Sequence, residues 1–436
     1  MNLGFRKCRK AIAAVTAATI FAPAWAAGES LQQAWQQAMQ HDYALAAATA
    51  NADSAHASER AAQAARWPSL NATGAYTRFA TAPSFQFAAP GFALQAPIFA
   101  DNEFASAGVQ MQLPIYTGGR ITAAIDAAHQ AVIGASAAES IARSALRLDV
   151  AESYVAVIRT KRLLQTAESS VASLRAHADD VGSMVERALV ARNDLLAARV
   201  ALANAEQQRV RAENGVALAY AAYNRRLGEP LDRAPELDAT IAVDRELAAQ
   251  SLAALLERAA DSRSELQALT AQADALALNA KAERAQLLPQ FALTGGYNYL
   301  QNEILDRRDF SMIGVGFNWH LFDAGQARHR SDALQSASRA ARRQFDDLHT
   351  QIELQVREAW LNVREARTRV TTSGEAAAQA EENLRIAREL YGTGLGTNTQ
   401  VLEAIALKVS AENNRDNAVL DESLAQLRLA HAVGSL

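Results

Sequence analysis

The residues of this chain that could bind a phosphate or a metal ion, a glycine-rich run and the histidines, do not form a catalytic pattern. The run Gly392–Gly396 is as glycine-rich as a phosphate-binding loop, but it lacks the preceding strand and the spacing that such a loop needs. The eight histidines are scattered, and no two are four residues apart, the spacing that would place both rings on one helix face for a metal. The sequence therefore predicts neither an enzyme nor a cofactor or metal site.

The N-terminal segment has the features of a secretory signal peptide. A basic stretch at 6–10 precedes an apolar run at 11–22, which is too short to span a membrane, and Ala24-Trp25-Ala26 fits a cleavage site. We therefore expect residues 1–26 to be removed after export. The only cysteine, Cys8, would leave with them, so the exported chain would have no disulfide and no thiolate ligand.

Composition narrows the possible partners of the exported chain. Removal of the signal peptide leaves 39 basic and 47 acidic residues, a net charge of −8, which argues against nucleic acid as a partner. No later segment has about 18 consecutive apolar residues, so any membrane span would have to be made of strands. The chain is 50% hydrophobic but only 6% aromatic, and its alanine-rich helices need long contacts or oligomers for stability.

The longest regular pattern lies between positions 326 and 434, a stretch without proline. Apolar or small residues recur every three or four positions from Phe345 to Tyr391, as on one face of a long helix in a coiled coil. A helix over 326–390 would be roughly 100 Å long. The glycines at 392–396 permit a reversal, so the sequence predicts a helical hairpin with a return helix at about 399–433.

The same pattern occurs twice in the chain. Residues 120–228 match 326–434 at a constant offset of 206, and further upstream the offset is 221. We therefore predict two repeats, 27–228 and 247–436, joined by a linker at 229–246. The first repeat carries fifteen extra residues, which fall in the Phe- and Pro-rich run 79–107 and are expected in a loop.

Each repeat also contains a predicted β-hairpin, at 70–116 and at 291–322. The clearest strand alternates Ile313, Val315, Phe317, Trp319 and Leu321 with small or polar residues. Strands of about 9–11 residues with one apolar and one polar face suit a barrel that has lipid outside and water inside. A soluble hairpin with one buried face fits each pair equally well, but the signal peptide and the flanking long helices favour the membrane.

The order of these elements resembles the TolC-like outer membrane efflux family over residues 29–434. The resemblance rests on two strand-to-helix junctions, Pro114–Arg120 and His320–Gln326, and on two helical turns, 187–197 and 391–404. No single motif is diagnostic, but the order and the duplication of these motifs are.

The resemblance implies a mainly α fold with a membrane β-barrel. Three copies of the chain would form a homotrimer, in which four strands per copy build a shared twelve-stranded barrel and the helical hairpins build a periplasmic tunnel. Four strands alone cannot close a barrel, and an open edge is not tolerated in lipid.

In function, the resemblance implies an outer membrane channel subunit of a Gram-negative bacterium. It would be a passive exit duct for small molecules or polypeptide in a tripartite efflux or type I secretion system, with a periplasmic adaptor (membrane fusion) protein and an inner membrane pump as partners. Two alternatives remain open. One is a periplasmic adaptor, which normally carries a single long hairpin between split β domains, and the other is a secreted coiled-coil scaffold without a membrane span.

The resemblance also assigns two sets of site residues. The turns would contact the adaptor, and the matching residues are Ala188, Leu189, Val190, Gly394, Leu395 and Gly396. Asp194 and Tyr391 match a linked pair that holds the tunnel closed, and Glu403 matches a carboxylate that faces the axis and would attract cations. Gln400 and Gly396 depart from the family pattern, which has a carboxylate and an arginine there. In the simplest alternative these are ordinary turn residues, with Asp194 favoured by the helix dipole.

Overall fold

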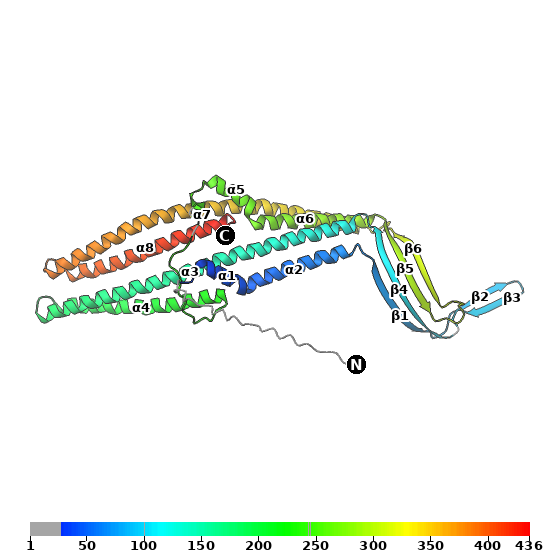
Figure 1. The fold of residues 1–436 in the computed structure, drawn as a ribbon, viewed down its shortest axis with the longest axis horizontal. Coiled ribbons are helices and arrows are strands. Elements are labelled where there is room, and N and C mark those ends of the chain that lie inside the picture. The colour runs from blue at the N-terminus through cyan, green and yellow to red at the C-terminus, as the bar shows by residue number, and fades with distance from the viewer. Residues whose placement is uncertain (1–27, 100, 243, 245) are drawn as a thin grey trace, which may run out of the picture.

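The computed structural model describes residues 28–99, 101–242, 244 and 246–436, and the predicted signal peptide lies outside these residues. The molecule is long and mainly helical (Figure 1). A four-stranded sheet lies at one end of a wall of long helices, and two helical turns lie at the other end. None of the helices described combines the length and the apolar character required to cross a membrane.

Two very long helices run through the wall. They are α3 (Arg120–Glu186) and α7 (Gln326–Gly392), and each has 67 residues, which corresponds to about 100 Å. The shorter wall helices are α2 (Tyr43–Ala64), α4 (Arg192–Leu227), α6 (Ser264–Arg284) and α8 (Asn398–Ala432). Two further short helices, α1 (Leu31–His41) and α5 (Leu252–Ser262), pack near the middle of the wall (Figure 1).

The helices and strands follow the same order across the molecule. α2 and α4 both pack on α3, while α6 and α8 both pack between α3 and α7. The sheet is antiparallel in the order β1-β4-β5-β6, and these strands adjoin α2, α3, α6 and α7 in that order. The strands are β1 (Ser69–Arg78), β4 (Glu103–Tyr116), β5 (Gln290–Leu300) and β6 (Asp309–Asn318).

The strand register places apolar side chains of all four strands on one face of the sheet. Leu70 pairs with Met111, and Leu293 with both Leu113 and Val315. The opposite face carries mostly polar or small residues such as Asn71, Gln110 and Gln112. Toward the end farthest from the helices it also carries Phe104, Phe310 and Met312. The larger exposed members of the apolar face are Leu70, Tyr76, Val109, Phe291, Tyr297, Tyr299, Ile313, Val315 and Phe317.

Two details differ from the sequence prediction. The alternation through Trp319 and Leu321 suggested a longer last strand, but β6 ends at Asn318. The chain then turns into α7, where the Asp323 carboxylate accepts hydrogen bonds from the Gly325 and Ala327 N–H groups. The expected loop at 79–107 contains a separate hairpin of β2 (Ser84–Ala89) and β3 (Phe92–Pro97), and β4 already begins at Glu103. A two-residue Pro90-Gly91 turn, with Gly91 at a φ of 84°, permits this hairpin.

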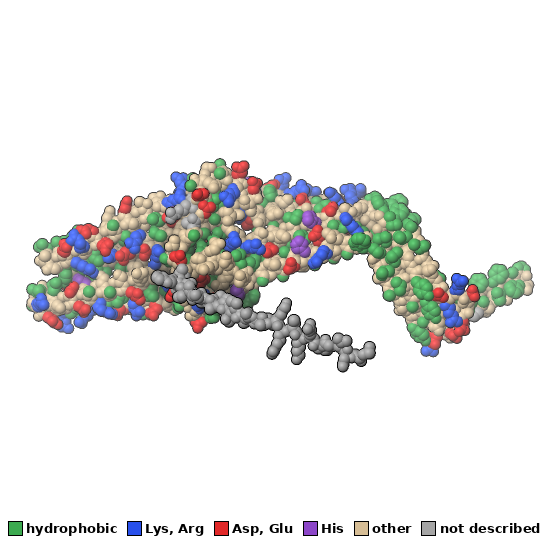
Figure 2. All heavy atoms as spheres, viewed as in Figure 1, with side chains coloured by type: hydrophobic (Ala, Val, Ile, Leu, Met, Phe, Trp, Pro, Cys, Tyr) green, Lys and Arg blue, Asp and Glu red, His purple; other side chains and the backbone are tan. Residues whose placement is uncertain are grey.

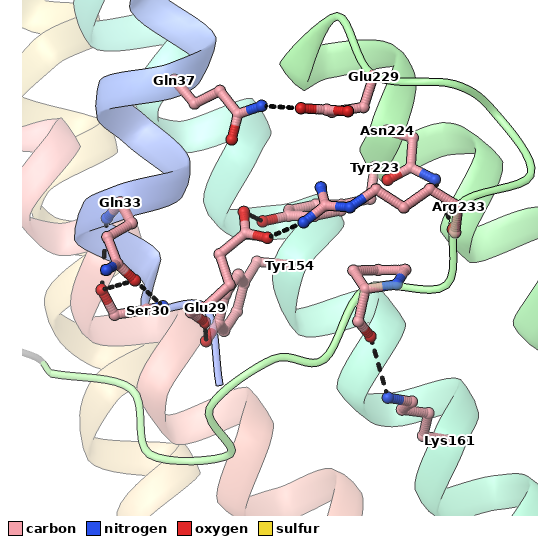
Figure 3. Close-up of polar contacts among 11 residues, drawn as sticks. Glu29, Ser30, Gln33, Gln37, Tyr154, Lys161, Tyr223, Asn224, Glu229 and Arg233 are labelled. Atoms are coloured by element: carbon pink, nitrogen blue, oxygen red, sulfur yellow. Dashed lines mark hydrogen bonds and ion pairs between the residues drawn. The ribbon is translucent and has the colours of Figure 1, made fainter. Parts of the chain in front are cut away.

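A polar cluster fixes Glu29 and the segment that follows α4 to the middle of the wall (Figure 3). The Glu29 carboxylate accepts hydrogen bonds from the Tyr223 hydroxyl at 2.6 Å and from Arg233 at 3.0 Å. The Tyr154 hydroxyl lies 2.7 Å from the carbonyl oxygens of both Glu29 and Asp238, and burial raises its pKa to about 12. Glu29 and the segment after α4 are therefore held together against α3.

Candidate functional site

Both helical turns lie at the same end of the molecule, farthest from the sheet (Figure 1). We call the turn between α3 and α4 the first tip and the turn between α7 and α8 the second tip. Each presents one exposed leucine, Leu189 in the first tip and Leu395 in the second, with exposed fractions of 68% and 80%. The six residues that the family resemblance assigns to adaptor contact therefore lie at one end of the molecule, where a partner can reach them.

The backbone reverses in the same way at the two tips. Ala188 and Gly394 both have left-handed φ values, 58° and 78°. The following leucine N–H donates back to the end of the long helix, from Leu189 to Met184 O and from Leu395 to Leu390 O, both at 2.9 Å. Left-handed backbone is unfavourable for alanine, so the first tip carries strain that the glycine in the second tip avoids.

The backbone is tightly packed at the second tip. Gly396 donates its N–H to Leu390 O at 3.0 Å, and a Cβ atom at this position would lie 3.0 Å from the Tyr391 nitrogen. The backbone here leaves little space for any side chain. The backbone of the second tip therefore favours glycine at position 396, where the family pattern has a larger residue.

A buried polar contact, which the sequence analysis did not predict, joins the two tips. The Asn398 side-chain N–H donates to the Asp194 carbonyl at 3.1 Å, which turns the Asn398 Oδ1 toward His177 Nε2, 2.7 Å away. The imidazole must then carry its proton on Nε2. His177 and Asn398 are both more than 90% buried, so this contact ties α3 to the first turns of α4 and α8.

The three expected gate residues have different surroundings. Tyr391 is buried against the His177 ring, 5.6 Å between centroids, and its hydroxyl has no hydrogen-bond partner among the described residues. Burial raises the pKa of this hydroxyl, and the nearby Asp194 carboxylate raises it further. Asp194 is half-buried and Glu403 is exposed on α8. The structure thus brings Tyr391 and Asp194 close without a hydrogen bond, and Glu403 stands apart.

A groove of about 780 Å³, lined by both polar and apolar side chains, lies between α3, α7 and α8 just inside the tips. Tyr391, His177, Asp180, Arg388, Lys408, Glu412 and several serines line it. Arg388 donates to Ser173 Oγ at 2.5 Å and bridges α7 to α3. Within the described part of the chain, no group of three or more His, Cys, Asp or Glu side chains is placed to hold a metal ion. The groove thus offers polar contacts between helices.

The model of a known family, the outer membrane efflux proteins, matches residues 34–229 and 255–435. This chain belongs to the outer membrane efflux protein family. It is 24% identical over 428 residues to the outer membrane protein TolC of Vibrio cholerae serotype O1, a match that covers 96% of this chain and 93% of that protein.

Solved structures show the same fold. The outer membrane protein VceC of Vibrio cholerae superposes with a TM-score of 0.79 at 20% identity, covering 93% of this chain and 96% of that chain. The CmeC outer membrane channel of Campylobacter jejuni gives 0.77 at 15% identity, covering 100% and 94%.

The family membership settles the broad function and the location. The protein acts in efflux, and it resides in the outer membrane of the cell. The two alternatives considered from the sequence, a periplasmic adaptor and a secreted scaffold without a membrane span, are not supported by these matches.

Proposed function

We propose that three copies of this chain form one channel, a passive exit duct through the periplasm and the outer membrane. The observation that carries the proposal is that, among the described residues, the sheet and the helical wall both end without a partner on the same two sides. β1 and α4 form one side, and β6 and α7 form the other. Three such units, joined side to side, would close twelve strands into a barrel and the helices into a tunnel, and would leave no free strand edge in lipid.

The edges of the helical wall carry apolar side chains suited to such joining. On α4, Leu196, Val200, Val210 and Leu218 are all more than half exposed. On the outer side of α7 the corresponding exposed residues are Leu354, Leu361, Ile386 and Leu390. Exposed apolar side chains repeated along long helices are typical of an interface between subunits.

The sheet has the dimensions and the chemistry of a membrane span. Its strands have 10 to 14 residues, enough to cross the hydrocarbon when tilted. Exposed aromatic residues gather at its two ends: Trp67, Tyr116 and Trp319 near the helices, and Tyr76, Tyr297 and Tyr299 near the opposite end. This is the distribution expected at the two interfaces of a bilayer, with the polar face lining the lumen.

The tips would serve as the docking end for a periplasmic adaptor, which would connect the channel to an inner membrane pump in a tripartite efflux or type I secretion system. Small residues and one protruding leucine at each tip allow close approach of a partner backbone. Asp194 and Tyr391 would help to hold the tunnel closed. Glu403, repeated three times around the axis, would add a site that attracts cations.

The trimer and the channel are tested together. The purified protein should migrate as a heat-sensitive trimer in the outer membrane fraction, and it should give discrete single-channel currents in a planar bilayer. Recovery as a monomer without conductance would refute the proposal.

The docking role of the tips is tested by replacing the exposed leucine of each tip with a charged residue. Leu189→Glu and Leu395→Glu should abolish cross-linking to the adaptor and efflux. Leu231→Glu is the matched control, because Leu231 is a similarly exposed leucine (57%) far from the tips. Intact cross-linking in both tip variants would rule out adaptor contact there.

The gate is tested by conductance. Asp194→Ala and Tyr391→Phe should raise the single-channel conductance if these residues help to hold the tunnel closed. Conductance unchanged in both variants would remove them from the gate.

A further inference from the structure

The β2–β3 hairpin, which we call the ribbon, has an apolar face that none of the described residues covers. Phe87 pairs with Leu94, and Phe85 and Phe92 share their face, with exposed fractions between 47% and 57%. The other face carries Gln86 and Gln95. No charged residue occurs from position 79 to 99.

A charged collar separates the ribbon from the apolar face of the sheet (Figure 2). Arg78 and Glu103 at the ends of β1 and β4 lie 3.9 Å apart, and Arg308 and Glu303 in the neighbouring loop lie 3.7 Å apart. These charges mark the outer boundary of the region that hydrocarbon can cover, so the ribbon lies beyond it. A two-stranded hairpin is at best marginally stable alone in water, and this one would expose four large apolar side chains. We therefore expect a protein partner to cover its apolar face.

The residues that flank the ribbon, around Phe79 and Phe99, form its root. This root packs on the polar face of the sheet. Phe104 pairs with Thr77 and points to the same side as Gln110 and Gln112. The Phe99 ring stacks on Phe104 with 4.5 Å between centroids, and Phe79 packs on both rings.

A second contact holds the root from the other half of the chain. Asn302, which is buried, donates from Nδ2 to the Ile98 carbonyl at 2.9 Å. If the polar face lines the lumen, as proposed above, the ribbon starts on the lumen side of the barrel mouth.

The dimensions of a twelve-stranded barrel allow three ribbons to meet. With strands about 4.8 Å apart and tilted by about 40°, such a barrel has a radius of roughly 12 Å. Three equivalent roots on its rim would then be roughly 21 Å apart, and a strand of six residues is about 20 Å long. Each ribbon is thus long enough to reach its neighbours across the mouth.

We propose that the apolar faces of the three ribbons pack against one another over the outer mouth of the channel. The partner of this face is the same face of the two other copies of the chain. The inference rests on the proposed trimer. The packed ribbons would form an uncharged constriction that cargo must push apart, a second barrier at the opposite end from the tips.

Single cysteines test this packing, because the exported chain is predicted to have none of its own. In a Cys8→Ser background, Phe87→Cys and Leu94→Cys should each form disulfide-linked dimers under mild oxidation. Gln86→Cys and Gln95→Cys, on the opposite face, should cross-link severalfold less. Removal of residues 84–97 in favour of a short Gly-Ser turn should raise the single-channel conductance.

The outcomes separate this inference from the proposed function. A stable, conducting trimer without cross-links at Phe87→Cys and Leu94→Cys, and with conductance unchanged by the deletion, would overturn the ribbon packing and leave the channel intact. Quenching of a fluorophore at Phe87→Cys by spin-labelled lipid would also overturn it, because the face would then lie in the membrane. A monomer without conductance would defeat both proposals.

Discussion

The first helical hairpin, α3 with α4, and the second, α7 with α8, reach nearly the same backbone with different side chains. Both begin after a left-handed glycine, Gly119 at 85° and Gly325 at 83°, and both end at one, Gly228 at 72° and Gly434 at 75°. The last two glycines pack on corresponding short helices. A Cβ at Gly228 would lie 2.8 Å from His41 at the end of α1, and one at Gly434 would lie 3.0 Å from Ser262 at the end of α5.

The helix breaks beside these glycines show how far the side chains differ. Asp42, between α1 and α2, caps the next helix by accepting the Leu45 N–H at 2.8 Å. The corresponding residue between α5 and α6 is Arg263, which is 7% exposed and donates to the carbonyl of Ala432 at the end of α8. It also donates to Glu265 and Gln355. One backbone geometry can therefore be stabilised locally in one half and by long-range contacts in the other.

Substitution at these two breaks should give the largest difference between the halves. Arg263→Ala should destabilise the protein by about 3–5 kcal/mol, because it leaves the Glu265 carboxylate and helix-end carbonyls without their donor. Asp42→Ala should cost only about 1 kcal/mol, the usual loss for a helix N-cap. Thermal unfolding in detergent measures both, and hydrogen exchange should show early opening of α8 only in the arginine variant. Equal losses would contradict the contrast.

The strand-to-helix junctions should give the next largest difference. Gly118 and Ala324 both have left-handed φ values, 62° and 53°. A Cβ at Gly118 would lie 2.8 Å from the Leu288 Cβ, so Gly118→Ala should cost about 2–4 kcal/mol through strain and overpacking. Ala324→Gly should be neutral or should stabilise by up to about 1 kcal/mol, because it relieves the same strain. Unfolding midpoints of the two variants check this, and a tolerated Gly118→Ala would refute the packing argument.

The first turns of the return helices should differ by a smaller amount. Thr397 caps α8 and forms a capping box with Gln400, whereas Ala191 at the start of α4 makes no side-chain cap. Thr397→Ala should therefore cost about 1 kcal/mol, and Ala191→Thr should gain up to about that much. Hydrogen exchange of the first-turn amides reports both changes locally. The comparison fails if the two substitutions shift protection in the same direction.

The smallest expected effect concerns pH at the end of α8. Burial lowers the pKa of His431, and the charge of Arg263 lowers it further, against the opposing carboxylates of Glu265, Asp149 and Glu152. The folded state therefore favours the neutral imidazole. As the pH falls below the ordinary histidine value of about 6.5, the unfolded chain takes up the proton more readily and stability declines.

A matched pair of variants isolates this histidine. His431→Gln should reduce the loss of thermal stability between neutral and mildly acidic pH. Arg225→Gln, at the corresponding and exposed position of α4, should leave the pH profile unchanged. An unaltered profile in His431→Gln would assign the pH response to other groups.

The sequence by itself determined the local elements of this protein. Apolar spacing and the absence of proline located the long helices, and glycines located both ends of each hairpin. Alternation located the four strands of the sheet. These features depend on residues close together in the chain, so their patterns can be recognised directly from the sequence. The ribbon is the local feature that was missed, although Pro90-Gly91 lies between two short apolar alternations there.

Only the tertiary structure decided which distant residues meet. His177 and Asn398 are 221 positions apart, and nothing in either segment marks them as a buried pair. Asp194 and Tyr391 were paired by family resemblance, and the structure places them near each other without a hydrogen bond. The shared order of strands and helices, and hence the two unpartnered sides, also follows from contacts between elements far apart in sequence. Such contacts depend on packing in space, which local propensity does not encode.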